Sequence, residues 1–293
     1  PATHARILDE AAKVQNAEAI LWRIEKRGVA PSHLMGTMHV SDVRITTLSP
    51  AAAKALDGSK SVLLEVADLS PKATVDAITK SAQLMMFTDG RRLDKLLSPD
   101  DFAVVQALVA KSGLPGDLAT VFRPWLVNTL MAVSECERKN AEAGHPVLDS
   151  KIGREAEARK IKVIGLETIE SQLAAMSSLP DAEQVEMLRA GLKYAARTDD
   201  MLETLTQMYV KRRMGAAMPF NLALAATAGV SPDAFKGFQQ QLLDKRNRKM
   251  LDGARPLLEK GAAFVAVGAL HLSGPTGLVQ LLRDDGYTVT AVD

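Results

Sequence analysis

The chain has 293 residues, of which 47% are hydrophobic and 24% are charged, a composition typical of globular proteins. Its 36 Lys and Arg residues nearly balance its 35 Asp and Glu residues, so no long-range field attracts a highly charged partner. Aromatic residues make up only 4%, which argues against the stacking surfaces that bind single-stranded nucleic acid. We therefore expect no nucleic-acid partner.

Two further features bear on location and redox chemistry. No run of apolar residues reaches the about 18 residues of a membrane-spanning helix, so we expect no membrane span in this chain. The sequence begins at Pro1 rather than at Met, and removal of a signal peptide is one explanation. The single Cys136 cannot form an intrachain disulfide, and its helical, apolar surroundings predict a small core residue.

The N-terminal part of the chain predicts strands separated by turns. Short apolar segments punctuated by Gly and Pro indicate strands at residues 18–26, 33–38 and 61–66. Between the second and the third, an alanine-rich stretch ending at residue 56 fits a short helix. Ser49 is its expected N-cap, and Pro50 takes the first helical position.

The middle of the chain is almost wholly helical in pattern. Helix starts recur from about residue 70 to 260, for example at 98–101 and 231–234, and one strand is expected near 161–166. Residues 262–268 and 287–292 then indicate strands on either side of a helix that begins near Pro275. The predicted fold is α/β within one domain over residues 1–293. Its mixed central sheet comes from residues 18–69 and 261–293, and a long helical insertion separates them.

Two stretches at opposite ends of the chain share a pattern. Residues 34–40 and 266–272 each contain an apolar run followed by Gly-x-x-His, with the histidines at His39 and His271. A glycine lets the backbone turn sharply at the end of a strand, and the histidine can then point into the crevice outside the sheet. Each histidine alone is also compatible with a surface or capping role. Together they predict a single site, because both turns belong to the same sheet.

A carboxylate completes a plausible ligand set. Two imidazoles and one carboxylate suit zinc, manganese, cobalt or iron, and they leave positions open for water and substrate. Glu65 ends the apolar strand expected at 61–66, where a carboxylate is unfavourable unless it is paired, hydrogen-bonded or bound to metal. The alternative is that Glu65 lies just past the buried part of the strand and is solvated.

Arg246 is the candidate cation of the site. On a helix of 100° per residue it falls at the centre of an apolar stripe, formed by Phe235, Phe238, Leu242 and Met250. Such an arginine reaches solvent or meets an anion. It could hold a substrate carbonyl, stabilise an oxyanion or brace Glu65. Asn247 lies at the edge of the same face and is a candidate substrate contact.

Two other carboxylates adjoin expected helix starts. Asp149 and Glu167 precede or begin helical patterns, where a carboxylate commonly caps the helix or complements its dipole. We interpret both in that way.

The ordered landmarks of the chain resemble the TraB/PrgY/GumN family, relatives of the Tiki metalloproteases. The resemblance rests on residues 21–24, 34–39, 63–65, 166–168 with Gln172, 246–247 and 267–272. It implies a mixed α/β sheet similar to that of erythromycin esterases and ChaN-like proteins. It also implies divalent-metal-dependent hydrolysis, with cleavage of peptide bonds in the Tiki branch.

When the motif positions of the family are matched to this sequence, they fall on the same residues as the patterns above. His39, His271 and Glu65 are then the expected ligands of a divalent metal (Mn, Co or Zn) that activates water. Glu65 could instead act as general base, and Arg246 would stabilise the oxyanion. The expected partner is a peptide or small-molecule substrate, and the expected location is periplasmic or extracellular.

Two alternatives remain open from the sequence. A TraB-like protein could bind a peptide or signal without any chemistry. A ChaN-like protein could handle iron or haem with the histidines as axial ligands, although the low aromatic content makes this the weaker alternative.

Overall fold

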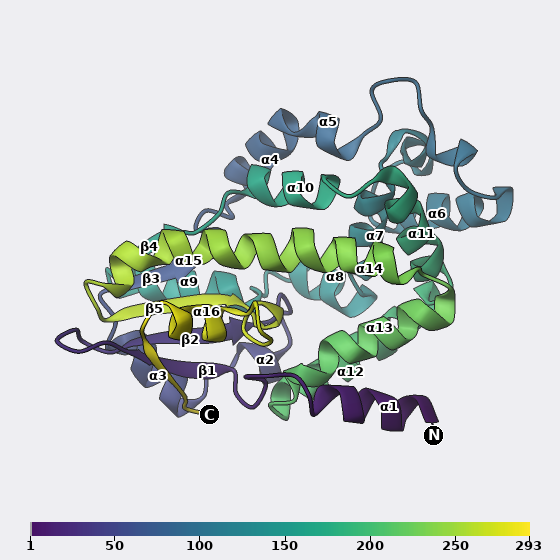
Figure 1. Cartoon of the computed structure of the whole chain (residues 1–293). Helices are drawn as coiled ribbons and strands as arrows, with labels where there is room; N and C mark the ends of the chain where they lie inside the picture. The colour runs from purple at the N-terminus through teal and green to yellow at the C-terminus, as the bar shows by residue number, and fades with distance from the viewer. Residues whose placement is uncertain (1) are drawn as a thin grey trace.

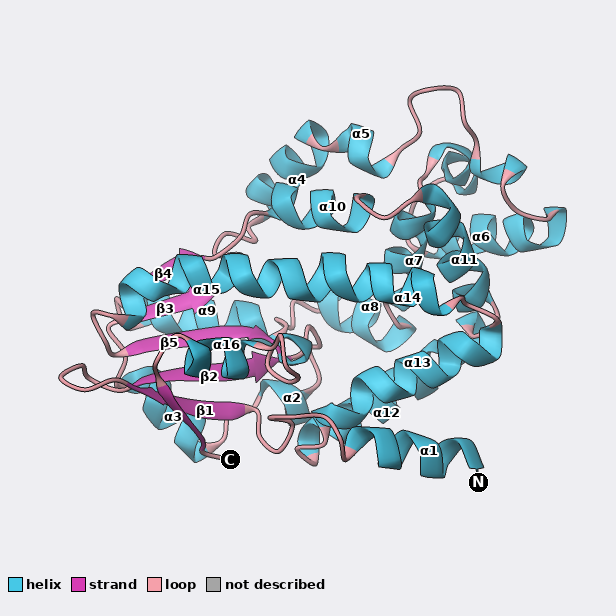
Figure 2. Cartoon of the chain, in the orientation of Figure 1, coloured by secondary structure: helices cyan, strands magenta, loops and turns pink. Residues whose placement is uncertain are grey.

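A mixed six-stranded sheet forms the centre of the molecule. The computed structural model describes residues 2–293, and the strand order is β4-β3-β5-β2-β1-β6 (Figures 1 and 2). The strands are β1 (Leu21–Glu25), β2 (Ser32–Thr37), β3 (Ser61–Leu64), β4 (Lys162–Gly165), β5 (Ala263–Gly268) and β6 (Thr288–Ala291). Strands β4, β3, β5 and β2 are parallel neighbours, and β1 is antiparallel to both β2 and β6. The predicted mixed α/β fold is confirmed.

The two ends of the chain meet at the middle of this sheet. Strand β5 lies between β3 and β2, so Val265 pairs with Leu63 on one side and with Leu34 on the other. All six expected strands are present, with ends shifted by a few residues. The apolar runs are continuous because the central strands are covered on both faces, as parallel sheets require.

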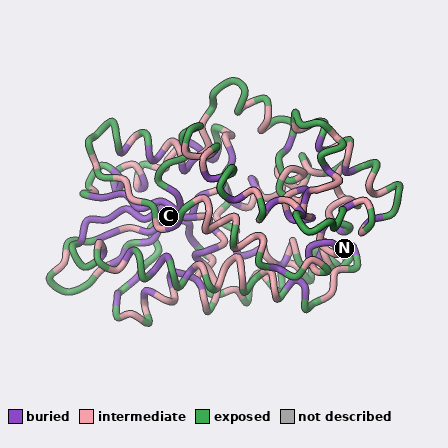
Figure 3. The backbone as a smooth tube through the Cα atoms, turned by 90° about the horizontal axis from the view of Figure 1, so that it is seen from above, coloured by how far each residue is buried: buried purple, intermediate pink, exposed green. Residues whose placement is uncertain are grey.

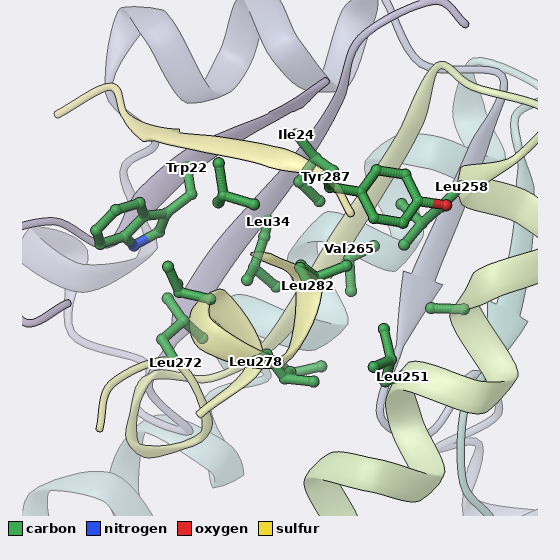
Figure 4. Close-up of a cluster of buried hydrophobic side chains, with 14 of the residues drawn as sticks. Trp22, Ile24, Leu34, Leu251, Leu258, Val265, Leu272, Leu278, Leu282 and Tyr287 are labelled. Carbon is green, nitrogen blue, oxygen red and sulfur yellow. The ribbon is translucent and has the colours of Figure 1, made fainter. Parts of the chain in front are cut away.

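Helices cover each face of the sheet. On one face, α15 (Lys245–Leu258) and α16 (Leu278–Asp284) pack over side chains of β1, β2 and β5. Figure 4 shows this cluster, which contains Trp22, Ile24, Leu34, Leu251, Leu258, Val265, Leu272, Leu278, Leu282 and Tyr287. On the other face, α2 (Val43–Thr46), α3 (Pro50–Asp57) and α9 (Leu148–Ala158) pack against Met35, Val62, Leu64 and Phe264. The central strands β3 and β5 are buried over almost their whole length, and buried segments gather in this part of the molecule in Figure 3.

The insertion forms a helical layer with its own apolar cluster. Its other helices are α4 (Pro71–Lys80), α5 (Ala82–Met85), α6 (Pro99–Lys111), α7 (Pro124–Ala132), α8 (Glu135–Glu142), α10 (Ile169–Ser177), α11 (Asp181–Leu192), α12 (Thr198–Val210), α13 (Ala217–Ala228) and α14 (Pro232–Gln239). Val105, Val127 and Leu188 are fully buried between α6, α7 and α11. A helix that the sequence did not predict, α1 (Ala2–Ala11), packs along α13 (Figure 1).

The capping residues behave as expected from the sequence. Ser49, Ser98 and Ser231 each accept a hydrogen bond from a backbone N–H in the first turn of α3, α6 and α14, and each is followed by Pro at the first helical position. These caps satisfy donors that the helix itself leaves unpaired. None of the helices in residues 2–293 combines the length and apolar character that crossing a membrane requires.

Three local expectations need correction. The helix expected near Pro275 begins at Leu278, because a 3₁₀ turn (Ala269–His271) and a loop come first. Cys136 is exposed, because it lies in α8 and the apolar helix α7 before it already ends at Ala132. Helices α14 and α15 are joined by a π-helical turn, Gln240–Asp244. This turn breaks the uniform rotation of 100° per residue on which the predicted apolar stripe depends.

Candidate functional site

The candidate site lies at the carboxyl edge of the parallel strands. His39 follows β2, Glu65 follows β3, Glu167 follows β4 and His271 follows β5. Parallel neighbours end at the same edge of a sheet, where ligands of open α/β sheets commonly bind. Oε1 of Glu65 lies 3.8 Å from Nε2 of His271, so the structure brings two of the predicted ligands side by side.

The two Gly-x-x-His turns pack directly against each other. A Cβ atom built at Gly36 would lie 3.0 Å from Cα and Cβ of Ala269, and a Cβ at Gly268 would lie 3.2 Å from Oε1 of Glu65. Neither glycine has a positive φ. The turns therefore do not require the positive φ that glycine allows, and the glycines are needed because neighbouring atoms approach so closely.

His271 is buried, and its orientation is fixed by Asn247. The Asn247 side-chain N–H donates to the carbonyl of Thr276 over 2.8 Å, which turns its oxygen toward His271 Nδ1, 2.6 Å away. Because that oxygen only accepts, Nδ1 of His271 carries the proton and Nε2 is the acceptor nitrogen. The acceptor nitrogen faces the carboxylate of Glu65. Burial lowers the pKa of His271 to about 4, so the ring is neutral at neutral pH.

His39 is held in the same way by Asp149. Nδ1 of His39 lies 2.9 Å from Oδ2 of Asp149, whose other oxygen accepts a hydrogen bond from the Thr37 hydroxyl over 2.7 Å. The hydrogen bond to Asp149 raises the pKa of His39 to about 9. Asp149 is buried, whereas 61% of the His39 side chain is exposed. The ring is therefore held at one nitrogen and exposed to solvent elsewhere.

Glu65 is surrounded by hydrogen-bond donors. The Gly268 N–H donates to Oε1 over 2.7 Å, and the Gln172 amide donates to Oε2 over 2.9 Å. Arg246 Nη2 also donates to Oε2, over 2.7 Å. Burial opposes ionisation of Glu65, but nearby positive charge and the Gly268 N–H outweigh it and lower the pKa of this carboxyl. Glu65 is thus a buried, ionised carboxylate, and the solvated alternative is excluded by its 6% side-chain exposure.

Arg246 joins two buried carboxylates. Its Nη2 lies 2.6 Å from Glu167 Oε2, and its Nε also donates to Glu167, while Nη1 donates to the carbonyl of Leu242. Only 14% of the Arg246 side chain and 2% of the Glu167 side chain are exposed. Burial alone would lower the pKa of Arg246, but pairing with Glu167 and Glu65 raises it. Of the alternatives open from the sequence, the arginine meets anions and braces Glu65.

Two residues of the cluster had been interpreted differently from the sequence. Asp149 and Glu167 do not cap the adjoining helices, whose N-cap residues are Val147 and Thr168. Asp149 does lie in the first turn of α9, where a carboxylate complements the helix dipole. Both carboxylates also bind partners of the site, His39 and Arg246. Asn247 was expected to contact substrate, but it is 2% exposed and its amide is used by His271 and Thr276.

The formal charges of the cluster favour a cation. Glu65, Asp149 and Glu167 are buried and are accompanied by one guanidinium, that of Arg246. With His271 neutral and His39 protonated, the cluster carries one negative charge, and it would carry two in a poorly solvated place once His39 released its proton. Buried charge of one sign is unfavourable unless it is balanced, and a divalent cation would balance it.

The donor chemistry fits a divalent metal, although the side chains are not gathered around one point. Within residues 2–293, no group of three or more His, Cys, Asp and Glu side chains is arranged to hold a metal ion. Each imidazole nevertheless has Nδ1 bound to an oxygen acceptor, the partner arrangement usual for metal-binding histidines. Nε2 of His271 and Oε1 of Glu65 lie 3.8 Å apart. Two atoms at this separation can both bind one ion, because each metal–ligand bond is about 2.1 Å long.

Comparison with known proteins agrees with this arrangement of landmarks. The family model described as TraB/PrgY/gumN family matches residues 20–291. Metalloprotease TIKI2 of Danio rerio is 26% identical over 97% of this chain and 63% of its own length. Metalloprotease TIKI1 of Homo sapiens is 23% identical over 94% of this chain and 63% of its own length.

A bacterial relative is covered more completely. The uncharacterized protein YbaP of Escherichia coli (strain K12) is 25% identical over 86% of this chain and 87% of its own length. The chain therefore spans less than two thirds of the Tiki relatives but most of YbaP. No solved structure matches it significantly. With a family match that covers nearly its whole length, the chain belongs to the TraB/PrgY/gumN family.

Proposed function

We propose that this protein is a divalent-metal-dependent hydrolase that cleaves peptide bonds at the carboxyl edge of its sheet. The observation that carries the proposal is the pair formed by His271 and Glu65. Nε2 of His271 and Oε1 of Glu65 face each other over 3.8 Å, and both are acceptors. Two acceptors in a buried, negatively charged cluster repel each other unless a cation lies between them. The names of the Tiki relatives support the same reaction class.

The residues that would hold the cation are His39, His271 and Glu65. Bound there, manganese, cobalt or zinc supplies Lewis-acid activation of water and of a scissile carbonyl. His271 and Glu65 occupy fixed positions because Asn247 and Gly268 hold them. His39 is the exposed member. Because it is protonated below about pH 9, it must release its proton to become a ligand.

Arg246 acts in this proposal as a positioning residue. Its guanidinium donates to Glu65, to Glu167 and to the carbonyl of Leu242. It thereby keeps Glu65 ionised and fixes the direction of its oxygens. Oxyanion stabilisation by Arg246 would require it to exchange one of these acceptors for the substrate.

The test combines metal content with cleavage. Purified protein is loaded separately with Mn²⁺, Co²⁺ or Zn²⁺, passed through a desalting column, analysed for bound metal and incubated with a peptide library read by mass spectrometry. We expect metal-dependent cleavage that is lost in His39→Ala and His271→Ala, together with weaker metal retention. His145→Ala, at an exposed histidine outside the cluster, is the matched control.

Two results would contradict the proposed hydrolase function. Cleavage that survives a chelator, or that persists with metal in both histidine variants, would overturn the mechanism. Peptide binding without cleavage under every metal condition would instead favour a peptide-binding protein without chemistry.

A further inference from the structure

A cavity lies beside the candidate site. It has a volume of about 650 Å³, within the range of about 300–1,000 Å³ that is common for ligand pockets. Helices α1 and α13, the π-helical turn and the loop after β5 enclose it, and α1 packs along α13 at that end of the molecule (Figure 1). Its apolar lining includes Val14, Met214, Met218, Leu222 and Leu243.

A second, smaller cavity adjoins the first. It measures about 280 Å³, and its walls include Met187, Met201, Phe235 and Phe238. The two cavities share Met218 and Leu270 as lining residues. They therefore form two neighbouring apolar compartments on either side of the same pair of side chains.

Both compartments border the turn that carries His271. Leu270 directly precedes His271 in the second Gly-x-x-His turn, and it lines both cavities. Asn247, which holds the His271 ring by a 2.6 Å hydrogen bond, lines the larger one. A molecule in these compartments would contact the turn that carries a proposed metal ligand.

The lining indicates what kind of molecule fits. Four methionines line the two cavities: Met187, Met201, Met214 and Met218. Methionine is flexible and polarisable, so it adapts to apolar groups of different shape. The larger cavity also contains hydrogen-bonding side chains, among them Gln239, Asp244 and Ser273. Apolar compartments that also contain hydrogen-bonding groups suit a polypeptide, whose amides need partners, better than a fatty acid chain.

We infer that the two compartments bind apolar side chains of the substrate polypeptide, so that the enzyme acts next to hydrophobic residues without strict preference among them. The inference rests on the proposed hydrolase function and specifies its substrate class. The helical insertion supplies most of the binding surface, while the sheet supplies the chemistry. Side chains of both signs, Arg6, Glu10 and Lys13, also line the larger cavity, which gives no preference for a charged segment.

The experiment separates binding from cleavage. A labelled peptide in which Leu and Phe alternate with Ser is compared with a matched peptide that carries Gln in place of Leu and Phe. Affinity is measured by fluorescence anisotropy in a chelator, and cleavage is then measured with Mn²⁺. The variants are Met218→Glu, which places a carboxylate in both compartments, and Leu222→Glu, in the larger one. Leu222 is 42% exposed, so the second variant should fold even if the first does not.

We expect the apolar peptide to bind at least tenfold more tightly than its polar match. Met218→Glu and Leu222→Glu should each weaken its binding by about tenfold, because an unpaired carboxylate would be desolvated. Leu114→Glu is the control, since Leu114 is similarly exposed, at 39%, and lines neither cavity.

Three outcomes would overturn the inference: equal affinity for the two peptides, unchanged affinity in the folded variants, or tighter binding of a long-chain fatty acid than of the apolar peptide. Apolar binding that depends on Met218 and Leu222 without Mn²⁺-dependent cleavage would support the compartments and count against the hydrolase proposal.

Discussion

Asn247 holds the imidazole of His271 through a hydrogen bond of 2.6 Å, and its own amide is fixed by the carbonyl of Thr276. This pair determines which nitrogen of His271 carries the proton. It leaves Nε2 as an acceptor directed toward Glu65, 3.8 Å away. Asn247, on α15, therefore fixes the ring orientation and the proton position of His271, which lies in the 3₁₀ turn after β5.

The first prediction concerns this positioning role. Replacement of Asn247 by Leu keeps the approximate shape but removes the acceptor, so the His271 ring loses its fixed orientation and proton position. We expect Mn²⁺ affinity, measured by isothermal titration calorimetry, to fall by about 10-fold to 100-fold. Asn140→Leu, in α8, should leave it unchanged. Wild-type affinity in a folded Asn247→Leu protein would show that Asn247 does not act on the metal site.

The second prediction concerns the buried ion cluster. Arg246→Met leaves Glu65 and Glu167 buried without their cation, and removal of one partner from a buried ion pair typically costs about 3–5 kcal/mol. We expect a loss of that size in the free energy of unfolding in urea. Divalent metal should recover part of it, because a cation at Glu65 offsets the same charge.

Arg44→Met is the control for this loss. Arg44 also bridges two carboxylates, Asp42 and Glu203, but 42% of its side chain is exposed. Exposed ion pairs contribute little to stability because solvent screens them, so Arg44→Met should change the free energy of unfolding far less than Arg246→Met. Equal destabilisation by the two substitutions would contradict the argument that burial makes the Arg246 cluster different.

The sheet and part of the site could be predicted because their signals are local. Short apolar runs mark all six strands, and Gly and Pro mark the turns between the first three. Glu65 and Arg246 were found because a charge inside an apolar pattern is visible without knowledge of tertiary structure. The π-helical turn before Arg246 has no such marker, so the helix face was predicted without it.

Asp149 and Glu167 were missed because their local positions already had a sufficient explanation. Each lies near a helix start, where carboxylates are common. Their partners, His39 and Arg246, become neighbours only through the order of the strands in the sheet. Glu167 did carry one usable signal, since it follows β4 much as Glu65 follows β3. Recognising that signal requires knowing that β3 and β4 are parallel neighbours.

The third prediction tests the contact between the two Gly-x-x-His turns. In Gly36→Ala, the new Cβ would lie 3.0 Å from two atoms of Ala269 and from Cδ2 of Leu272. Overpacking of this kind typically costs about 1–3 kcal/mol, and it would push the turns apart. We expect a lower melting temperature and weaker Mn²⁺ binding.

Gly58→Ala is the matched control for Gly36. A Cβ there would meet its nearest atom at 3.5 Å, an ordinary contact, and Gly58 has φ −82°, which alanine adopts readily. It should change stability little. If Gly36→Ala were equally neutral, the close approach of the turns would not be what requires glycine.

The last prediction concerns acid stability and follows from the burial of His271. Its pKa is about 4 in the folded protein and 6.5 in the unfolded chain, so the unfolded state binds the proton first as the pH falls. The contribution of His271 to the free energy of unfolding should be fully present above pH 6.5. It should be lost as the pH falls toward 4, by up to about 3 kcal/mol from this group alone.

Carboxylates also titrate in this range, so the quantity to measure is the difference in unfolding free energy between wild type and His271→Gln at each pH. We expect that difference to shift against wild type between pH 6.5 and 4, because the variant lacks the titrating group. A difference that stays constant across this range would mean that His271 is protonated as easily in the folded protein as in the unfolded chain, which its burial argues against.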